Sequence, residues 1–393
     1  MQNMTNKFAD NKNIGGVITA RGNWLSSLNW QFDFYQNSNR KKRVDSEFEW
    51  GWFERYPKGI SRIAKHMLSK VLQRMPMRIP SGVSQEWVNK HATLLWEARE
   101  LLEDGLSKLL FDSMLILRCS SYSQFYFPRI NFEDFVSLIN EEPFLSKDLP
   151  LDYIGLPLRV FNLELNHQHQ ISPLKVISTK TQIHLLNSYR QYFIQRDSVD
   201  LTPVAGDVVL DCGACIGEIS VLIAGLVGIQ GEVHLFDPVP LHARYCQLQA
   251  SLNPKISHVL HINVLAVGDT SQEVVGSQDD ATSITPGGLC IDSFSTTTLD
   301  DYVSNKKLSR VNVIKMDIEG AEMAALEGAS QVIREFKPRL AISAYHKPED
   351  LWEIPHKLKE QNSDYRLFFG HHSPVSWESV YYASSGSIGA RTK

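Results

Sequence analysis

The second half of this 393-residue sequence predicts a doubly wound α/β sheet whose strands are mostly parallel. From about Gly206 onward, short apolar runs rich in β-branched residues alternate with stretches of helical periodicity, as they do when crossover helices join parallel strands. The last two apolar runs are separated only by 370–379, which is too short for a crossover helix. The sequence therefore predicts a mostly parallel sheet with an antiparallel last strand.

Each predicted element fits this alternation in turn. Seven runs have the composition of buried strands: 207–211, 232–236, 259–267, 311–316, 339–344, 365–369 and 380–383. Five helical stretches lie between the first six runs: 218–226, 240–252, 299–303, 322–336 and 348–361. Because a helical stretch follows each of the first five runs, those strands can return to the same edge of the sheet and pair in parallel.

Residues before about 200 lack this alternation. Helices are predicted at 85–110 and 179–192, and extended segments at 118–127 and 158–165. Proline, glycine and aspartate cluster at 197–206, just before the first strand of the sheet, which is typical of a domain boundary. We therefore predict a separate mixed α+β amino-terminal domain of unassigned fold (1–199), which shapes substrate access or mediates association, and then the sheet domain (200–393).

Composition and charge exclude several classes of protein. With 43% hydrophobic and 21% charged residues, the chain is typical of a soluble globular protein. The 40 basic and 44 acidic residues give a net charge of −4, which provides no positive field for nucleic acid. The first residues lack the apolar core of a secretory signal, no apolar run approaches the ~20 residues of a membrane span, and five scattered cysteines are typical of reduced thiols. We expect a cytoplasmic protein with no nucleic-acid partner and no membrane span.

A glycine-bearing turn follows the first strand of the predicted sheet, with Asp211, Gly213 and Gly217 in the pattern D-x-G-x-x-x-G. Open α/β sheets bind ligands at such turns, beyond the carboxyl ends of their strands. A dinucleotide fingerprint would need glycine in place of Asp211 and Ile216. An acid at the strand tip opposes a pyrophosphate but suits a cation, such as the ammonium and sulfonium of S-adenosylmethionine. A tight turn without a ligand is the alternative.

A second acid, Asp237, ends the second predicted strand twenty residues after Gly217. Its carboxylate can accept hydrogen bonds from both ribose hydroxyls of an adenosyl group. Alternatively, Asp237 only caps the helix that starts near Pro240. Acids at both strand tips predict S-adenosylmethionine as the cofactor, with Asp211, Gly213, Gly217 and Asp237 as its binding residues.

Three carboxylates follow the fourth predicted strand. Asp317 and Glu319 are two residues apart, so on an extended strand end they share a face and could address one substrate hydroxyl, one cofactor amine or one divalent cation. Glu322 has a simpler explanation as an acid in the first turn of the next helix. His346 follows the fifth strand and is the leading candidate for the general base, with a capping or packed histidine as the alternative. A base at His346 or Asp317, or a cation held by Asp317 and Glu319, would help to remove the hydroxyl proton of an acceptor.

Three weaker motifs have simpler explanations. The pair His371 and His372 is expected to border the substrate opening, because it lies on the loop before the last strand. His167 and His169 lack a surrounding cluster of metal ligands. The basic run 40–43 is expected to be a solvated loop.

Several segments together resemble the FkbM family of S-adenosylmethionine-dependent methyltransferases. They span about 200–385 and are DVVLDCGACIGE, FDP, TLDDYV, VIKMDIEGAEMAALEGA, KPRLAISAYHKPEDLWEIP and FGHHS. The resemblance implies a Rossmann-like methyltransferase fold and transfer of a methyl group to oxygen, commonly a hydroxyl of a sugar or natural product. It also implies cofactor contacts at Asp211, Gly213, Gly217 and Asp237, and active-site positions for Asp317, Glu319 and His346. Many relatives have glutamate in place of Asp237, whose shorter side chain reduces the reach to the ribose.

The leading hypothesis is therefore an O-methyltransferase that acts on a hydroxyl of a sugar, glycan or natural-product acceptor. The alternatives are a nicotinamide-dependent oxidoreductase on a similar sheet, and a non-catalytic interaction protein that retains the methyltransferase fold. Binding of NADH but not of S-adenosylhomocysteine would favour the oxidoreductase. The sequence leaves open the acceptor, a divalent cation and a homo-oligomer.

Overall fold

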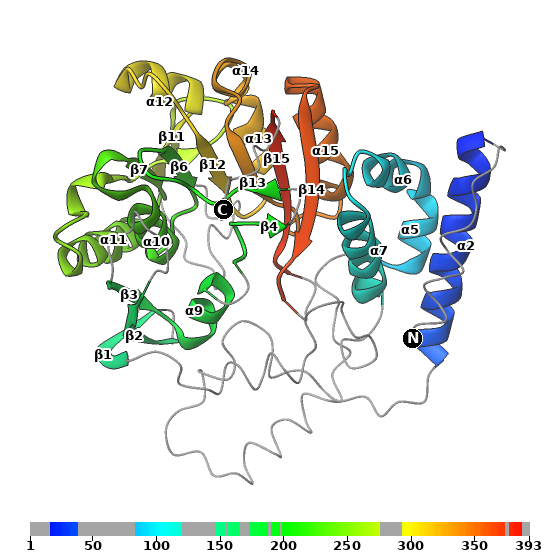
Figure 1. The fold of residues 1–393 in the computed structure, drawn as a ribbon, viewed down its shortest axis with the longest axis horizontal. Helices are drawn as coiled ribbons and strands as arrows, with labels where there is room; N and C mark the ends of the chain where they lie inside the picture. Colours follow the sequence, from blue (N-terminus) through cyan, green and yellow to red (C-terminus); the bar gives the residue numbers. More distant parts are fainter. Residues whose placement is uncertain are drawn as a thin grey trace, which may run out of the picture.

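The computed structural model describes residues 16–37, 83–119, 146–153, 156–164, 173–187, 190–196, 199–275, 293–373 and 377–386. A seven-stranded sheet with the order β14-β15-β13-β12-β6-β7-β8 lies at its centre (Figure 1). The strands are β6 (Val208–Cys212), β7 (Glu232–Phe236), β8 (Leu260–Asn263), β12 (Val313–Met316), β13 (Arg339–Ser343), β14 (Tyr365–His371) and β15 (Ser379–Ser385). β15 pairs antiparallel with both of its neighbours and the other pairs are parallel, so the predicted antiparallel last strand is confirmed.

Helices cover both faces of this sheet, because its strands are apolar on both sides. They are α10 (Glu218–Val227), α11 (Pro240–Leu252), α12 (Leu299–Lys306), α13 (Glu322–Glu327), α14 (Ser330–Phe336) and α15 (Asp350–Gln361). Along β7, Val233 and Leu235 belong to the core beneath α10. Phe236 points to the other face, where its ring packs edge-on against Tyr302 of α12 at 4.6 Å between centroids. The side-chain alternation along the strand thus builds two separate cores.

The chain leaves the sheet earlier than expected from the predicted strand 259–267. β8 ends at Asn263, and Ala266–Val267 form β9 in a second sheet, of order β10-β11-β9, with β10 (Glu273–Val275) and β11 (Ser293–Thr297). β9 pairs in parallel with β11. The prediction of one continuous strand is wrong, because an apolar run does not specify which neighbour the strand will pair with.

The predicted helix 322–336 is divided into α13 and α14 at Gly328 and Ala329. A Cβ atom on Gly328 would lie 2.1 Å from the backbone oxygen of Gly268, so a close approach of two backbones requires glycine here.

Other boundaries also differ in the amino-terminal half. The predicted helix 85–110 comprises α5 (Gln85–Lys90), α6 (Ala92–Glu100) and the start of α7 (Gly105–Cys119). Residues 118–119 are therefore helical and not extended. The predicted helix 179–192 is α9 (Lys180–Asn187), and the extended segment 158–165 lies largely within β2 (Leu156–Leu163). Residues 120–127, the basic run 40–43, and His167 with His169 lie outside the described residues.

Helices of the amino-terminal half cover the edge strand β14. In Figure 1, α7 lies beside this strand with α5 and α6 next to it, and α2 (Gly16–Asn37) packs on the outer side of these helices. The Leu367 carbonyl accepts a hydrogen bond from the Glu103 amide at 2.8 Å. The Phe369 amide donates to Ser107 Oγ at 2.9 Å, and the Phe369 carbonyl accepts from Arg196 Nη2 at 2.7 Å. These contacts satisfy backbone groups that an edge strand would otherwise expose.

A second part of the amino-terminal half packs against α10 and α11. It is the antiparallel sheet of β1 (Ser146–Tyr153), β2 and β3 (Leu174–Ser178). In α11, Gln249 accepts from the Ile177 amide at 2.9 Å and donates to the Ile177 carbonyl at 2.7 Å. Asn253, one turn later, makes the same two bonds to Lys175 at 2.9 and 2.7 Å. Two side-chain amides thus make the hydrogen bonds to β3 that a neighbouring strand would otherwise make.

The residues before 200 therefore share hydrophobic cores with the central sheet. One cluster joins Phe111 of α7 to Phe369 of β14, with 5.5 Å between ring centroids. Another joins Phe161 of β2 to Val221 of α10. The division at residue 199 stays a prediction, and the described residues of the two parts are in extensive contact. Within the described ranges, no helix has both the length and the apolar character of a bilayer span.

We expect Gly213→Ala to destabilise the fold much more than Gly206→Ala. Both glycines have a left-handed backbone, with φ of +81° and +83°, so each substitution incurs a strain of about 1 kcal/mol. Only at Gly213 would the new Cβ meet another backbone, 1.8 Å from the Asp317 oxygen, and the forced separation of β6 from β12 should cost at least about 3 kcal/mol. Urea unfolding measures both, and equal losses would contradict this account of the strand ends.

Candidate active site

A buried ion pair joins the ends of β6 and β12. Asp211 and Lys315 are opposite each other in the register of these strands, and Asp211 Oδ1 lies 3.0 Å from Lys315 Nζ. Ser220 Oγ donates to Asp211 Oδ2 at 2.6 Å, and Lys315 Nζ donates to the Gly213 carbonyl at 2.7 Å. The Asp211 carboxylate is fully buried, and its direct contact with a cofactor stays a prediction. Through Lys315, however, Asp211 is linked to the Gly213 carbonyl and so helps to hold the glycine loop.

The glycine loop has the tight backbone that its sequence predicts. Gly213 and Gly217 both have positive φ angles, and Gly217 begins α10. A Cβ on Gly217 would lie 3.0 Å from the sulfur of Cys246 in α11. The backbone amides of Gly213 and Ala214 donate to the carbonyl of Phe236, at 2.9 and 3.0 Å. The loop is therefore held against the end of β7, from which Asp237 emerges.

Asp237 binds both the loop and the start of α11. Its Oδ2 accepts a hydrogen bond from the Cys215 amide at 3.0 Å, and its Oδ1 accepts from the Val239 amide at 2.9 Å and His242 Nδ1 at 2.7 Å. The capping alternative considered from the sequence therefore describes part of what Asp237 does. A carboxylate offers about four acceptor positions, so one position on Oδ2 is available to a ligand.

Glu218, which the sequence did not single out, is a buried acid at the first position of α10. Its Oε2 has no hydrogen-bond partner among the described residues. Burial, and to a smaller extent the charges of Asp211 and Asp237, raise the pKa of Glu218 to about 7. An acid directly after the last glycine of the loop is typical of the first turn of a helix. The sequence around Glu218 therefore gives no separate sign of a binding role. A cation beside Glu218 would compensate for its burial.

The structure brings the three predicted catalytic residues together. His346 Nε2 lies 3.6 Å from Asp317 Oδ1 and 3.7 Å from Glu319 Oε2. His346 Nδ1 is hydrogen-bonded to Glu322 Oε1 at 2.9 Å, so Glu322 is both a first-turn acid and the partner of this ring. Burial lowers the pKa of His346, but the bond to Glu322 and the charges of all three acids outweigh it and raise the pKa to about 9. His346 is therefore a cation at neutral pH.

Asp317 and Glu319 differ in their surroundings. Asp317 accepts hydrogen bonds from the hydroxyls of Tyr192 and Tyr345, each at 2.8 Å. Burial would raise the pKa of Asp317, but His346, a nearby lysine and these two bonds hold it below its usual value. Glu319 has a left-handed backbone, with φ of +55°, and burial raises its pKa to about 7 despite the charge of His346. Glu319 can therefore exchange a proton near neutral pH.

Two further groups in this cluster come from segments that are distant in sequence. Gln191 Nε2 donates to Tyr192 Oη at 2.9 Å and to the carboxylate of Glu378. Burial, and then the charge of Asp317, raise the pKa of Glu378 to about 8. No local pattern marks Tyr192 or Glu378 as site residues. Lys315 did carry a signal, because a lysine within a buried apolar strand needs a charged partner.

The weaker motifs that lie in the described ranges have local partners. His371 Nδ1 is bonded to Ser379 Oγ at 2.9 Å, and His372 Nε2 to Tyr382 Oη at 2.7 Å. The expectation that this pair borders the substrate opening stays a prediction. No disulfide bond joins the four cysteines in the described ranges, at positions 119, 212, 215 and 246.

Comparison with known proteins bears on the same region. Residues 211–372 match the family model of the methyltransferase FkbM domain. No curated protein matches the chain. Among solved structures, the methyltransferase FkbM from Methylobacillus flagellatus KT is 20% identical, with a TM-score of 0.48, and the match covers 75% of this chain and 59% of that one.

Two more distant structures contain cofactors. Fibrillarin from Aeropyrum pernix, with natively bound S-adenosyl-L-methionine, is 12% identical over 61% of this chain and 100% of its own, with a TM-score of 0.32. An O-methyltransferase from Bacillus cereus in complex with SAH is 12% identical over 56% of this chain and 84% of its own, also with a TM-score of 0.32.

The sheet has a single antiparallel strand, and the acid-bearing glycine loop lies at its carboxyl edge, where open α/β sheets bind their ligands. Residues 211–372, in the carboxy-terminal half of this chain, carry the methyltransferase FkbM domain.

We expect the His346 imidazole to titrate at a pH of about 9 in the ligand-free protein, and at a lower pH in Glu322→Gln. The glutamine keeps a hydrogen-bond acceptor near Nδ1 but removes the negative charge that favours the imidazolium. NMR of the histidine rings across a pH titration measures both values, and the absence of one resonance in His346→Gln identifies the ring.

Stability should follow the same titration. The pKa of His346 is raised above its ordinary value of 6.5, so its contribution is complete below pH 6.5 and is lost as the pH rises through about 9. The free energy of unfolding of the wild type, relative to that of His346→Gln, should therefore decline over that window. A ring that titrates at or below 6.5 would contradict a cationic His346.

Proposed function

We propose that this protein transfers a methyl group from S-adenosylmethionine to a hydroxyl oxygen of a sugar, glycan or natural-product acceptor. The match of residues 211–372 to the methyltransferase FkbM domain, on a sheet whose carboxyl edge gathers acidic side chains, carries the proposal. When bound, the cofactor supplies an activated methyl group on a positively charged sulfur. The hydroxyl acceptor follows from the FkbM resemblance of the sequence.

The residues around the glycine loop fit a cationic nucleoside. Glu218 is a buried acid with one carboxylate oxygen that has no partner among the described residues, and the ammonium of the cofactor would supply the missing charge. Asp237 has one acceptor position left for a ribose hydroxyl. Asp211, which Lys315 already neutralises, would act through the position of the loop. We therefore assign the ammonium to Glu218 and the ribose to Asp237.

The residues around His346 fit the activation of a hydroxyl. Glu319 is the carboxylate whose pKa, about 7, is best matched to accepting a proton at neutral pH. Asp317 is a weaker base, because two tyrosine hydroxyls and a cationic ring hold its pKa low. His346, as a cation, would orient and stabilise the oxygen that loses its proton. We therefore propose Glu319 as the base and His346 as its charged partner, with Asp317 fixing the ring.

A divalent cation held by Asp317 and Glu319 is the competing means of activation. The ligand atoms that lie within 4.8 Å of one another belong to Asp317, Glu322 and His346, so this group could hold one ion but does not include Glu319. Against it, Asp317 already accepts two hydrogen bonds and is compensated by His346 and Lys315. Turnover that survives EDTA would favour Glu319, and turnover lost to EDTA and restored by Mg²⁺ would favour the cation.

We predict that Glu218 and Asp237 contact different parts of the cofactor, and that two ligands distinguish their roles. Glu218→Gln should weaken binding of S-adenosylhomocysteine by about 1.5 to 3 kcal/mol, because it removes a charged acceptor from the ammonium. It should leave 5′-methylthioadenosine unaffected, because that nucleoside has no amino acid part. Asp237→Ala should weaken both ligands by about 1.5 to 3 kcal/mol through the ribose. Isothermal titration calorimetry measures all four affinities.

The matched controls address folding and the alternative class. Glu218→Gln keeps the shape of the side chain, and a melting temperature close to that of the wild type shows that the loop is intact. Asp237→Asn, which retains one acceptor for the backbone amides, serves where Asp237→Ala unfolds. Unchanged affinity for S-adenosylhomocysteine in the variants at both Glu218 and Asp237 would reject this cofactor site. Tight NADH binding without S-adenosylhomocysteine binding would favour an oxidoreductase.

For the chemical step, Glu319→Gln should lower kcat by about 10²-fold and leave the affinity for S-adenosylhomocysteine unchanged. The acceptor is first identified by mass spectrometry of glycans and metabolites. It is the species whose mass is lower by one methylene in cells without the gene than in cells with it. Its methylation by the wild type should rise with pH through about 7 as Glu319 loses its proton, and the variant should lack this rise. A Glu319→Gln enzyme with full activity would return the role of base to His346 or Asp317.

A further inference from the structure

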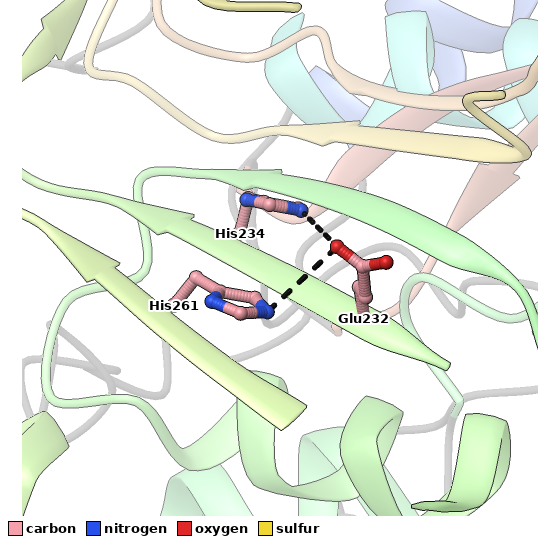
Figure 2. A group of neighbouring side chains, drawn as sticks. All are labelled: Glu232, His234 and His261. Atoms are coloured by element: carbon pink, nitrogen blue, oxygen red, sulfur yellow. Dashed lines mark hydrogen bonds and ion pairs between the residues drawn. The ribbon is translucent and has the colours of Figure 1, made fainter. Parts of the chain in front are cut away.

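A second cluster of metal-ligating side chains lies away from the glycine loop, on the face of the sheet that α12 covers. Glu232 and His234 point to the same side of β7, and His261 of β8 is opposite His234 in the strand register. Figure 2 shows both imidazoles directed toward one carboxylate oxygen. Glu232 Oε2 lies 3.2 Å from His234 Nε2 and 3.8 Å from His261 Nε2. Glu232 begins β7, whereas Asp237 follows its end, so this cluster is separate from the proposed cofactor site.

A chain of hydrogen bonds links His234 to Tyr302 and Asn263. The Asn263 amide nitrogen donates to the carbonyls of Leu235 and His261, each at 3.0 Å, so its Oδ1 is the atom that faces Tyr302. The Tyr302 hydroxyl donates its single proton to Asn263 Oδ1 at 3.2 Å. Its oxygen lies 2.9 Å from His234 Nδ1 and accepts from it in the tautomer that is protonated at Nδ1. In that neutral tautomer, Nε2 carries a lone pair directed at Glu232.

A metal ion would complete this arrangement. A nitrogen lone pair and a carboxylate oxygen at 3.2 Å repel each other unless a proton or a metal ion lies between them. A proton on His234 Nε2 would join only His234 to Glu232, because His261 Nε2, at 3.8 Å from the carboxylate, is beyond hydrogen-bond distance. A metal ion would instead use the lone pairs of both rings and the carboxylate together.

The geometry points to a binding site for a divalent transition-metal ion of the Zn²⁺ type, with Glu232, His234 and His261 as its protein ligands. In a tetrahedral zinc site with bonds of about 2.1 Å, neighbouring ligand atoms are about 3.4 Å apart. The two observed distances of 3.2 and 3.8 Å bracket this value, and all three atoms lie within 4.8 Å of one another. Two imidazoles and one carboxylate suit zinc, whereas Mg²⁺ and Ca²⁺ prefer oxygen ligands.

The surroundings define what such an ion would do. His234 is held by Tyr302, as metal-ligating histidines usually are by an outer partner. The side chains of Glu232 and His261 are about two-fifths exposed, at 41% and 43%, so the ion has access from solvent and a fourth position for water. Lys306 is the nearest opposing charge, over the Tyr302 ring at 5.7 Å, and it is exposed. The ion would therefore tie the edge strand β8 to β7 and to α12.

Calorimetry with ZnCl₂ as the probe tests this site on the full chain after removal of metals with a chelator. We expect one equivalent of Zn²⁺ that binds at least about 100-fold more weakly in Glu232→Gln and in His261→Ala, because each loses a direct ligand. Tyr302→Phe, which removes only the outer hydroxyl, should weaken it by about 10-fold. His258→Ala, at an exposed histidine near the start of β8, should bind as the wild type does.

Two further measurements keep the test decisive. Co²⁺ in place of Zn²⁺ should give d–d absorption bands without thiolate charge-transfer bands, which excludes binding at Cys212 and Cys215. The melting temperature of the wild type should rise with Zn²⁺ concentration, and that of His261→Ala should not. Zn²⁺ binding that is absent, that carries thiolate bands, or that is equal in wild type, Glu232→Gln and His261→Ala would overturn the site and leave a proton between Glu232 and His234.

Discussion

The ion pair between Asp211 and Lys315 is the constraint on which the rest of the site depends. Removing both charges from water is costly, and the cost is recovered only when the geometry is good and the remaining polar groups are bonded. Here Ser220 completes the aspartate, and the carbonyl of Gly213 completes the lysine. The pair therefore fixes the ends of two adjacent strands and the first turn of the glycine loop at the same time. The same lysine contributes to the low pKa of Asp317, so it links the cofactor side of the site to the acceptor side.

The amino-terminal half completes this site as well as covering the sheet. Tyr192 donates to Asp317, and Gln191 connects Tyr192 to Glu378. On the other side, Gln249 bonds both to Ile177 of β3 and to the carbonyl of Ile216 in the glycine loop, at 3.2 Å. A displacement of either amino-terminal part would therefore move groups that contact the site. These contacts are the structural basis for the prediction that the amino-terminal half shapes substrate access.

The sequence predicted the parts of the fold and site that follow from local pattern and from one rule of topology. Buried apolar runs located all seven strands of the sheet, and the rule that parallel strands present their carboxyl ends at one edge brought Asp317, Glu319 and His346 together correctly. The strand that ends at Asn263 was predicted too long because its apolar pattern continues into a different sheet. Tyr192 and Glu378 could not be predicted, since they reach the site through contacts 125 and 187 residues apart in sequence.

The carboxylates of this protein divide according to whether a protein cation compensates them. Asp211 and Asp317 have Lys315 or His346 beside them, and they serve to hold the structure in place. Glu218 is buried and Glu319 is partly exposed beside His346, and each is less compensated than Asp317; their pKa values are raised to about 7. Burial of an acid without a partner costs free energy, and a ligand that brings a positive charge or a proton recovers it. The same reasoning would apply at Glu232, where the proposed metal ion would bring a positive charge between a carboxylate and two imidazoles. The less compensated acids are therefore where we expect a ligand to bind, and the compensated acids hold the surrounding structure in place.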